Sequence, residues 1–519
     1  MKEKRWLWLA VAALAGYFAL LILLALAESG HPNASIQSFS DALWYSIVTL
    51  STVGYGDLYP VTAVGKLIGL LFVLLSVGTL AFLVGSAVSL LTGQMLPRLQ
   101  LWLHRGKQWY VFSQLNDTSL ALAQSLKKKD TLLLFPLADR EKGPLMEKLC
   151  YYPGTMASAV ALKRDRCRLF FLDEESGSNY TQALSALSLG HPVYCCTEQT
   201  PDCCPERLTL FNRYACCARD YWRRHPLSTT EKAVILIGDG RYAWELLEQG
   251  LMVNVFAPEQ TVRYHVFGNW EDFRCCHPQL GLTLAINEEK PDTDSLLFHS
   301  QNWNADSALL SDAHRIILCS DDTKENMATL RKLRRYYCVN GRVHLRSEAS
   351  VPGETVFGTD SQIFTAENVM ANALTKAART MHQIYRESVS APVADWENLS
   401  EFTRQSNLAA ADHLLIKVRL LLQDESITSP TAEQMKSAYQ RFVEDPDRDR
   451  YRMIEHLRWL RFHSLLGWRY GPRRDNGARV HPLMLPYDSL SPAEQAKDDY
   501  AWQLLESMAQ KLENDLEDT

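Results

Sequence analysis

Two long apolar runs near the start of the chain dominate its hydrophobic pattern. Residues 6–27 form an uncharged stretch of 22 residues, about 33 Å long as a helix and sufficient to cross the hydrocarbon core of a bilayer. Residues 61–91 carry one charge, Lys66, near one end, where its long side chain reaches the membrane interface. Between them, residues 38–50 predict a short helix that enters the membrane with its negative C-terminal pole inside the bilayer. The pattern predicts two membrane spans joined by a re-entrant segment.

Positive charge flanks the two apolar runs but is absent between them until Lys66. The flanking residues are Lys2, Lys4 and Arg5 before the first run and Arg98, Arg105 and Lys107 after the second. By the positive-inside rule, we expect a multi-pass protein of the cell (inner) membrane with both termini in the cytoplasm. A cleaved signal peptide ending at residues 25–27 is the alternative, but its apolar core is normally shorter, at about 7–15 residues.

Beyond the apolar runs, strand-like and helix-like segments alternate, which is typical of a parallel sheet flanked by helices. The segments expected in the first such region are strands 109–112, 131–135, 168–172 and 192–194 and a helix over 119–126. Its first turn, residues 113–116, lacks the glycines that let a backbone approach a pyrophosphate. We therefore expect this domain to bind no dinucleotide.

A second alternating region begins at residue 233 with the apolar strand 234–237. A Gly-x-Gly-x-x-Ala turn follows, then a helix over 244–250, a strand over 253–256, a strand over 315–319 and a helix over 325–337. The turn and the acidic residue after the second strand give the nucleotide-binding candidates Gly238, Gly240, Ala243 and Glu259. The alternative for the turn is that it serves packing alone. Separately, Asp321, Asp322 and Glu325 either bind calcium or form a solvated loop.

Composition narrows the classes of partner. The 519 residues carry a net charge of −6 with a pI near 6.2, so no basic surplus indicates a nucleic-acid partner. Of the 12 cysteines, eight form the adjacent pairs 195–196, 203–204, 216–217 and 275–276, a spacing unsuited to zinc or disulfides. We expect small buried residues in a reducing compartment and no metal site, with a redox or metal role of Cys195 to Cys217 as the alternative.

Residues 49–57 (TLSTVGYGD), between the two apolar runs, carry the most specific chemistry. Four copies around an axis would direct successive backbone carbonyls inward to replace the hydration shell of a potassium ion. Glycines at alternate positions permit the left-handed backbone that this requires. An ordinary hairpin turn is the alternative, which the apolar flanks argue against. The candidate selectivity filter consists of Thr52, Val53, Gly54, Tyr55, Gly56 and Asp57.

On these residues, positions 5 to 95 resemble the two-span pore module of prokaryotic potassium channels. The resemblance implies a homotetramer in a lipid bilayer, with potassium ions in the filter and with Trp44, Tyr45 and Thr49 supporting it. It also gives Gly78 and Gly85 as candidate gating hinges, the alternative being close helix packing. The chain departs from some relatives at Val48, where they place a glutamate, and at Ser76, where they place a hinge glycine.

The tandem alternating regions over about 108–350 resemble the regulator-of-potassium-conductance (RCK, TrkA-N-like) domains that form a gating ring. The end of the chain, with Gly-Trp-Arg-Tyr-Gly at 467–471 and Leu-Pro-Tyr-Asp-Ser-Leu at 485–490, is similar to the RyR domain of ryanodine receptors. Its aromatic and basic side chains could stack a base and hold phosphates, or form a small core with solvated arginines. The candidate ligand residues there are Trp459, Trp468, Arg469, Tyr470, Arg473, Arg474, His481 and Tyr487.

The sequence thus predicts a multidomain chain: an α-helical membrane pore, then α/β Rossmann-like domains, then a mostly α-helical RyR domain. The expected parts are the pore (1–95), a linker (96–107), a degenerate Rossmann-like domain (108–228), a second Rossmann-like domain (229–390) and the RyR domain (391–519). We expect no enzyme but a potassium channel gated by a small-molecule ligand, nucleotide-derived and of unknown identity. The alternatives are the same channel as effector of a nucleotide-signalled bacterial defence response, and a membrane-anchored NAD-dependent enzyme or redox sensor.

Overall fold

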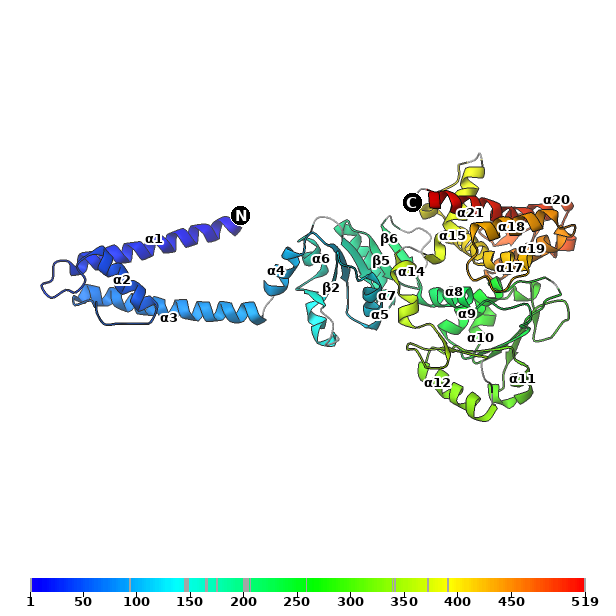
Figure 1. Ribbon diagram of the computed structural model, residues 1–519, viewed down its shortest axis with the longest axis horizontal. Helices are drawn as coiled ribbons and strands as arrows, with labels where there is room; N and C mark the ends of the chain where they lie inside the picture. Colours follow the sequence, from blue (N-terminus) through cyan, green and yellow to red (C-terminus); the bar gives the residue numbers. More distant parts are fainter. Residues whose placement is uncertain are drawn as a thin grey trace. The chain divides into compact units, whose positions relative to one another are not determined.

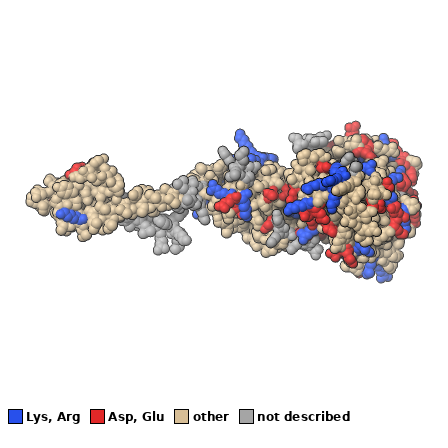
Figure 2. Space-filling view, turned by 90° about the horizontal axis from the view of Figure 1, so that it is seen from below, with Lys and Arg blue, Asp and Glu red and all other residues tan. Residues whose placement is uncertain are grey.

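A computed structural model of the chain divides into two compact units, residues 1–103 and 104–519, which are described separately (Figure 1). The structure describes all residues except 1, 93–94, 144–148, 164–166, 174–175, 199–204, 206, 258, 338, 340–341, 371–372, 390–391 and 518–519. On the face drawn in Figure 2, charged side chains are sparse over the first unit and dense over the second. The second unit thus has the surface of a water-exposed protein on this face, whereas the first does not.

The first unit consists of helices: α1 (Lys2–Glu28), α2 (Phe39–Leu50), α3 (Ala63–Thr92) and α4 (Met95–Leu103). A capping box begins α2, in which the Ser38 hydroxyl accepts from the Asp41 N–H and the Asp41 carboxylate accepts from the Ser38 N–H. Leu21, Ala42 and Phe72 bring α1, α2 and α3 into one small core. Among the described side chains, residues 63–88 are long and apolar enough to cross a membrane, and residues 15–28 form a shorter apolar helix.

The first sheet is parallel and six-stranded, in the order β3-β2-β1-β4-β5-β6. Its strands are β1 (Gln108–Phe112), β2 (Thr131–Pro136), β3 (Cys150–Tyr152), β4 (Cys167–Phe171), β5 (Val193–Cys196) and β6 (Leu208–Phe211). Its helices are α5 (Asp117–Leu126), α6 (Met156–Val160), α7 (Ser176–Ala186) and α8 (Arg213–Arg224). Stacked rings of Phe112, Phe135, Phe170 and Tyr194 join four neighbouring strands in its core. The parallel sheet matches the expected alternation, with β3 and β6 in addition.

The second sheet is also parallel, in the order β13-β12-β11-β7-β8-β10-β9. Its strands are β7 (Ala233–Ile237), β8 (Arg263–Phe267), β9 (Ala285–Ile286), β10 (Ser295–His299), β11 (Arg315–Leu318), β12 (Val343–Arg346) and β13 (Thr355–Phe357). Helices α9 (Arg241–Val253) and α10 (Glu271–Cys276) lie on one face, and α11 (Ser307–Asp312) and α12 (Thr323–Lys332) on the other (Figure 1). Chain order reverses beside β7, and such a switch point leaves a crevice at the strands' C-terminal ends.

The predicted strand over 253–256 is wrong. Helix α9 continues to Val253, and the strand that pairs with β7 is β8. Residues 254–256 are a buried connection, in which the Asn254 side chain donates to the Gly250 carbonyl and accepts from the Leu227 N–H. A short apolar run does not distinguish a buried loop from a buried strand, because both have the same composition.

The remainder of the second unit is mainly helical. Its helices are α13 (Asp360–Ile363), α14 (Ala366–Val369), α15 (Ala373–Ser388), α16 (Glu401–Asp412), α17 (Leu414–Leu422), α18 (Ala432–Glu444), α19 (Arg448–Leu465), α20 (Pro492–Gln495) and α21 (Tyr500–Glu517). Two short strands, β14 (Arg469–Tyr470) and β15 (Val480–His481), pair within the loop after α19. At the centre of its core, Phe442 stacks on Trp502, and Tyr451 meets the Trp502 ring edge to face.

The cysteines follow the expected burial only in part. Among described residues, Cys195, Cys196, Cys217 and Cys319 are buried and Cys216 is half-buried, and all described cysteines are free thiols. Cys275 and Cys276 are exposed, contrary to expectation, because the short α10 buries Phe273 instead. The pair Cys203 and Cys204 lies outside the described residues.

Candidate functional site

The loop after α2 has the alternating backbone that the filter hypothesis requires. Thr52, Gly54 and Gly56 have φ of 59°, 57° and 73°, so every second residue lies in the left-handed region. The N–H groups of Val53 and Gly54 both donate to the Val48 carbonyl, at 3.1 and 3.3 Å. Alternating left-handed and ordinary conformations turn successive carbonyls toward one side of the strand.

Trp44 connects α2 to the outer end of this loop. Its indole N–H donates to the Asp57 carboxylate at 2.8 Å, and its ring stacks on Tyr55 with centroids 6.3 Å apart. Tyr45 instead contacts Phe72 of α3, edge to face at 6.4 Å. Thr49 contributes its carbonyl, which accepts from the Thr52 N–H at 3.1 Å. The loop is therefore held by the helix that precedes it.

Glu28 was not predicted from the sequence, yet it ties α1 to the start of α3. Its buried carboxylate accepts from the N–H groups of Val61 and Thr62 and from the Thr62 hydroxyl, the last at 2.6 Å. A side chain at Gly65 would collide with that carboxylate, since a Cβ there would lie 2.0 Å from it. A single carboxylate ending an apolar run was the available signal.

The two candidate hinge glycines differ from the other glycines of α3. A Cβ added at Gly78 or Gly85 would meet no atom within 4 Å, whereas one at Gly69 would lie 2.7 Å from the Tyr45 hydroxyl. Within one chain, close packing therefore accounts for Gly69 but for neither hinge candidate.

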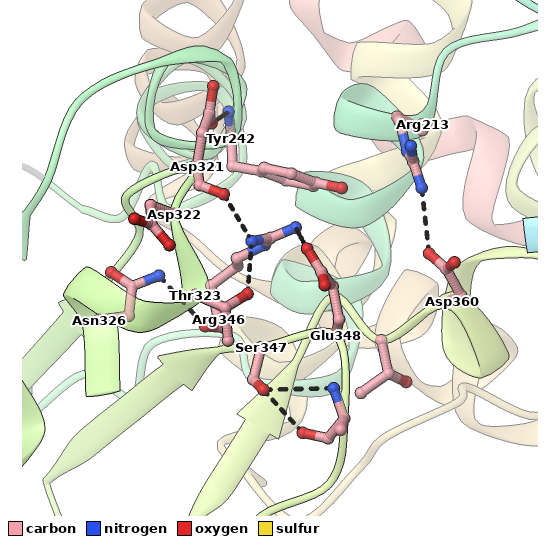
Figure 3. Close-up of polar contacts among 12 residues, drawn as sticks. Arg213, Tyr242, Asp321, Asp322, Thr323, Asn326, Arg346, Ser347, Glu348 and Asp360 are labelled. Carbon is pink, nitrogen blue, oxygen red and sulfur yellow. Dashed lines mark hydrogen bonds and ion pairs between the residues drawn. The ribbon is translucent and has the colours of Figure 1, made fainter. Parts of the chain in front are cut away.

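In the second sheet, the glycine turn leads directly into α9, and a carboxylate of the chain closes that helix end (Figure 3). The N–H groups of Arg241 and Tyr242 donate to the two oxygens of Asp321, each at 3.0 Å. An external anion would use these same groups. Cβ atoms at Gly238 and Gly240 would lie 2.4 Å from the Ser320 nitrogen and 2.5 Å from Asp321. The glycines thus have a packing role, and an internal anion occupies the helix terminus.

Arg346, at the end of β12, fixes the loop that carries Asp321. Its guanidinium donates to the Asp321 carbonyl at 2.8 Å and to the Thr323 hydroxyl at 3.0 Å, and lies 4.1 Å from the Tyr242 ring centroid (Figure 3). Nearby, Arg213 pairs with Asp360 at 3.0 Å; the pKa of Asp360 is raised because its burial outweighs the attraction of Arg213. These contacts join β12 to α9 and α8 to α13, and they were not predicted from the sequence.

The acidic residues considered for calcium have other partners. Asp322 accepts from the Lys324 N–H at 2.8 Å at the start of α12, and Glu325 accepts from the Ser320 hydroxyl at 2.6 Å. Among the described residues, no group of three or more His, Cys, Asp or Glu is arranged to hold a metal ion. The loop therefore caps two helices: Asp322 caps α12, and Asp321 caps α9.

Glu259 is not brought to the glycine turn. It lies between α9 and β8 and forms an ion pair with Arg450 of α19. The residue after β8 that faces the turn is Asn269, whose N–H donates to Asp239 at 2.7 Å. Ala243 lies in the first turn of α9 and is fully buried. A crevice of about 330 Å³ remains beside the turn, partly lined by Asp239, Gly240, Arg241, Asn269 and Trp270.

The candidate ligand residues near the C-terminus separate into a core and a surface. Trp468 packs with Leu460 and Met484 in a small core, and Trp459 lies against His463 and His481, with centroids 3.9 and 5.0 Å apart. Tyr487 is also buried and donates to Asp449; burial raises its pKa to about 12. The remaining candidates, Arg469, Tyr470, Arg473 and Arg474, are exposed. The arrangement favours the alternative of a small core with solvated arginines.

Comparison with known proteins identifies the class of the first unit: residues 7–93 match the family model described as "Ion channel". Over 76 residues the chain is 43% identical to a voltage-gated potassium channel of Aeropyrum pernix, which covers 15% of this chain and 24% of that protein. A further relative, potassium voltage-gated channel subfamily A member 4 of Homo sapiens, is 44% identical over 63 residues. The match covers 12% of this chain and 10% of that protein. The chain spans about a quarter or less of the length of these relatives.

Solved structures of the GsuK channel align with much of the chain at low similarity. The TM-score is 0.42 at 13% identity, covering 70% of this chain and 97% of the GsuK chain. For the GsuK channel bound to NAD, the TM-score is 0.39 at 12% identity, covering 72% and 85%. Likenesses at this level do not establish a shared fold.

Proposed function

We propose that the chain is one subunit of a homotetrameric, potassium-selective channel of the cell membrane, with both termini in the cytoplasm. The observation that carries the proposal is the left-handed backbone at Thr52, Gly54 and Gly56, in a segment whose sequence matches ion channels. Four such loops would surround a potassium ion with backbone carbonyls. The C-terminal pole of α2 would favour a cation beside them.

We further propose that the second unit gates the pore. Its two parallel sheets act as RCK-type domains, residues 391–519 act as an RyR-type sensor, and the ligand is nucleotide-derived. A ligand shifts a conformational equilibrium only by its differential affinity for the two states. Contacts that join the domains, such as Arg213 with Asp360, are where two ring conformations would differ.

Potassium and sodium flux from liposomes that contain the purified full chain tests the pore assignment. An alanine in place of Gly56 would be strained at φ of 73°, so we expect Gly56→Ala to abolish the preference for potassium. Gly30→Ala is the matched control, since a Cβ there meets no atom within 4 Å and its φ is not left-handed. Unchanged selectivity in Gly56→Ala would refute the filter assignment.

A further inference from the structure

A cavity of about 830 Å³ lies within the second unit where its three parts meet. Its walls come from β6 and α8 of the first α/β domain, from α9 of the second, and from α16 and α19 of the helical region. A molecule bound there contacts all three parts at once. Sequence patterns do not indicate this cavity, because its lining residues are spread over more than half of the second unit.

Glu245 of α9 lines this cavity and makes no hydrogen bond or ion pair with a described residue. Burial raises its pKa to about 8, and the nearby carboxylates of Glu248 and Glu198 add to the effect. At pH 7 the group is therefore mainly a neutral carboxylic acid. It offers one O–H donor beside one C=O acceptor.

Several charged groups of the described lining are paired with one another, whereas Glu245 is not. Arg219 of α8 forms two hydrogen bonds of 2.7 Å with Asp412 of α16, which also accepts from Gln249. Arg404 pairs with Glu401 at 2.9 Å. These pairs hold α8, α9 and α16 in fixed positions around the cavity.

Aromatic and cationic surfaces complete the lining. Trp396 and Phe462 contribute rings, and the guanidinium of Arg379 lies 5.3 Å from the ring centroid of Trp396. Rings accept a stacked base, and guanidinium groups suit phosphate. The cavity thus combines the surfaces that a nucleotide requires.

We propose that this cavity binds an adenine nucleotide, with the carboxyl group of Glu245 pairing with the edge of the base. Adenine presents the N7 acceptor beside the N6 amino donor, which complements a neutral carboxyl group, whereas the same edge of guanine presents two acceptors. The inference rests on the proposed function, since it names the ligand and the site through which the channel is controlled. Glu245 also lines the smaller crevice beside the glycine turn, and the proposal places the nucleotide in the larger cavity.

Equilibrium dialysis of ADP against the purified full chain in detergent tests the assignment. We expect Glu245→Gln to retain ADP affinity, because an amide supplies the same donor and acceptor, and Glu245→Ala to lose about tenfold or more. Affinity of the unaltered protein should fall between pH 7 and 9 and that of Glu245→Gln should not. We expect GDP to bind at least about tenfold more weakly than ADP. No ADP binding at pH 7, or equal affinity in Glu245→Ala, would overturn the proposal.

Two bulky substitutions locate the bound nucleotide. Leu408→Trp fills the cavity without touching the crevice beside Gly240, whereas Asp272→Trp obstructs only that crevice. We expect the first to abolish ADP binding and the second to preserve it; the reverse result would move the site to the crevice. Liposome flux is read separately. ADP binding without potassium flux refutes the proposed function alone, and flux without ADP binding refutes this inference alone.

Discussion

The Asp321 carboxylate takes the place of an external anion at the first turn of α9. It accepts from two backbone N–H groups, and Gly240 leaves the space that it occupies. Loss of such a cap costs about 0.5–2 kcal/mol. We therefore expect Asp321→Ala to speed amide exchange in the first turn of α9 by about 2- to 30-fold, measured by hydrogen–deuterium exchange.

We expect the exchange rate of Asp321→Asn to lie between those of the unaltered protein and Asp321→Ala. Asparagine keeps an acceptor but loses the charge that favours a helix N-terminus. Asp292→Ala is the matched control, because Asp292 is exposed and caps no helix. If the first turn exchanges at the same rate in Asp321→Ala as in the control, the cap contributes nothing and the turn is free to accept an external anion.

At the scale of elements, α19 is anchored to the second sheet by Arg461. This side chain is fully buried and donates to Asp294 at 2.9 Å and to the carbonyls of Leu251 and Thr283. Removing one partner of a buried ion pair costs about 3–5 kcal/mol, because the other charge remains buried. We expect Arg461→Met to lower the melting temperature of the second unit and to speed amide exchange in α19.

Arg448→Met tests the same change at the exposed start of the same helix and should leave both quantities unaltered. A second substitution, Asp294→Asn, should restore part of the stability of Arg461→Met by removing the stranded charge. Equal melting temperatures of Arg461→Met and Arg448→Met would show that α19 docks through its apolar contacts alone.

Sequence patterns predicted those elements whose signal is local. The left-handed positions at Gly54 and Gly56, the helix before them and the two parallel sheets all follow from composition and spacing over short windows. The Asp321 cap, the Glu28 contacts and the Arg461 anchor join residues tens to hundreds of positions apart. Nothing in a single sequence specifies such pairings. The misplaced strand at 253–256 has the same origin, because only tertiary pairing shows that β8 is β7's neighbour.

At the scale of the whole molecule, buried neutral histidines make the second unit sensitive to acid. His413 bonds the Val255 carbonyl at 2.9 Å, and its pKa is lowered to about 3 by burial, with repulsion from Lys417 and Arg458 outweighing Glu455. In the unfolded chain the pKa is near 6.5. Below pH 6.5 the unfolded state binds a proton that the folded state does not bind. The stability that is present above pH 6.5 is therefore lost as the pH falls toward 3.

The expected loss is about 2 kcal/mol per such histidine at pH 5. Melting temperatures of the full chain at pH 7.5, 6 and 5 should therefore decline less steeply in His413→Gln than in the unaltered protein. His314→Gln replaces an exposed histidine and should reproduce the unaltered slope. Parallel curves for all three proteins would show that protonated His413 is tolerated in the folded state.

The proposed roles of conduction and control fall in different compact units. The contacts that shape the filter, Trp44 with Asp57 and Glu28 with Thr62, lie entirely within residues 1–103. We expect a chain of residues 1–103 to conduct potassium in liposomes with the selectivity of the full chain, because its filter retains every described support. ADP should alter flux through the full chain only, since a ligand can shift the pore equilibrium only where its site is present. A truncated chain that still responded to ADP would place the sensor beside the pore, whereas one that lost selectivity would show that the second unit holds the filter in register.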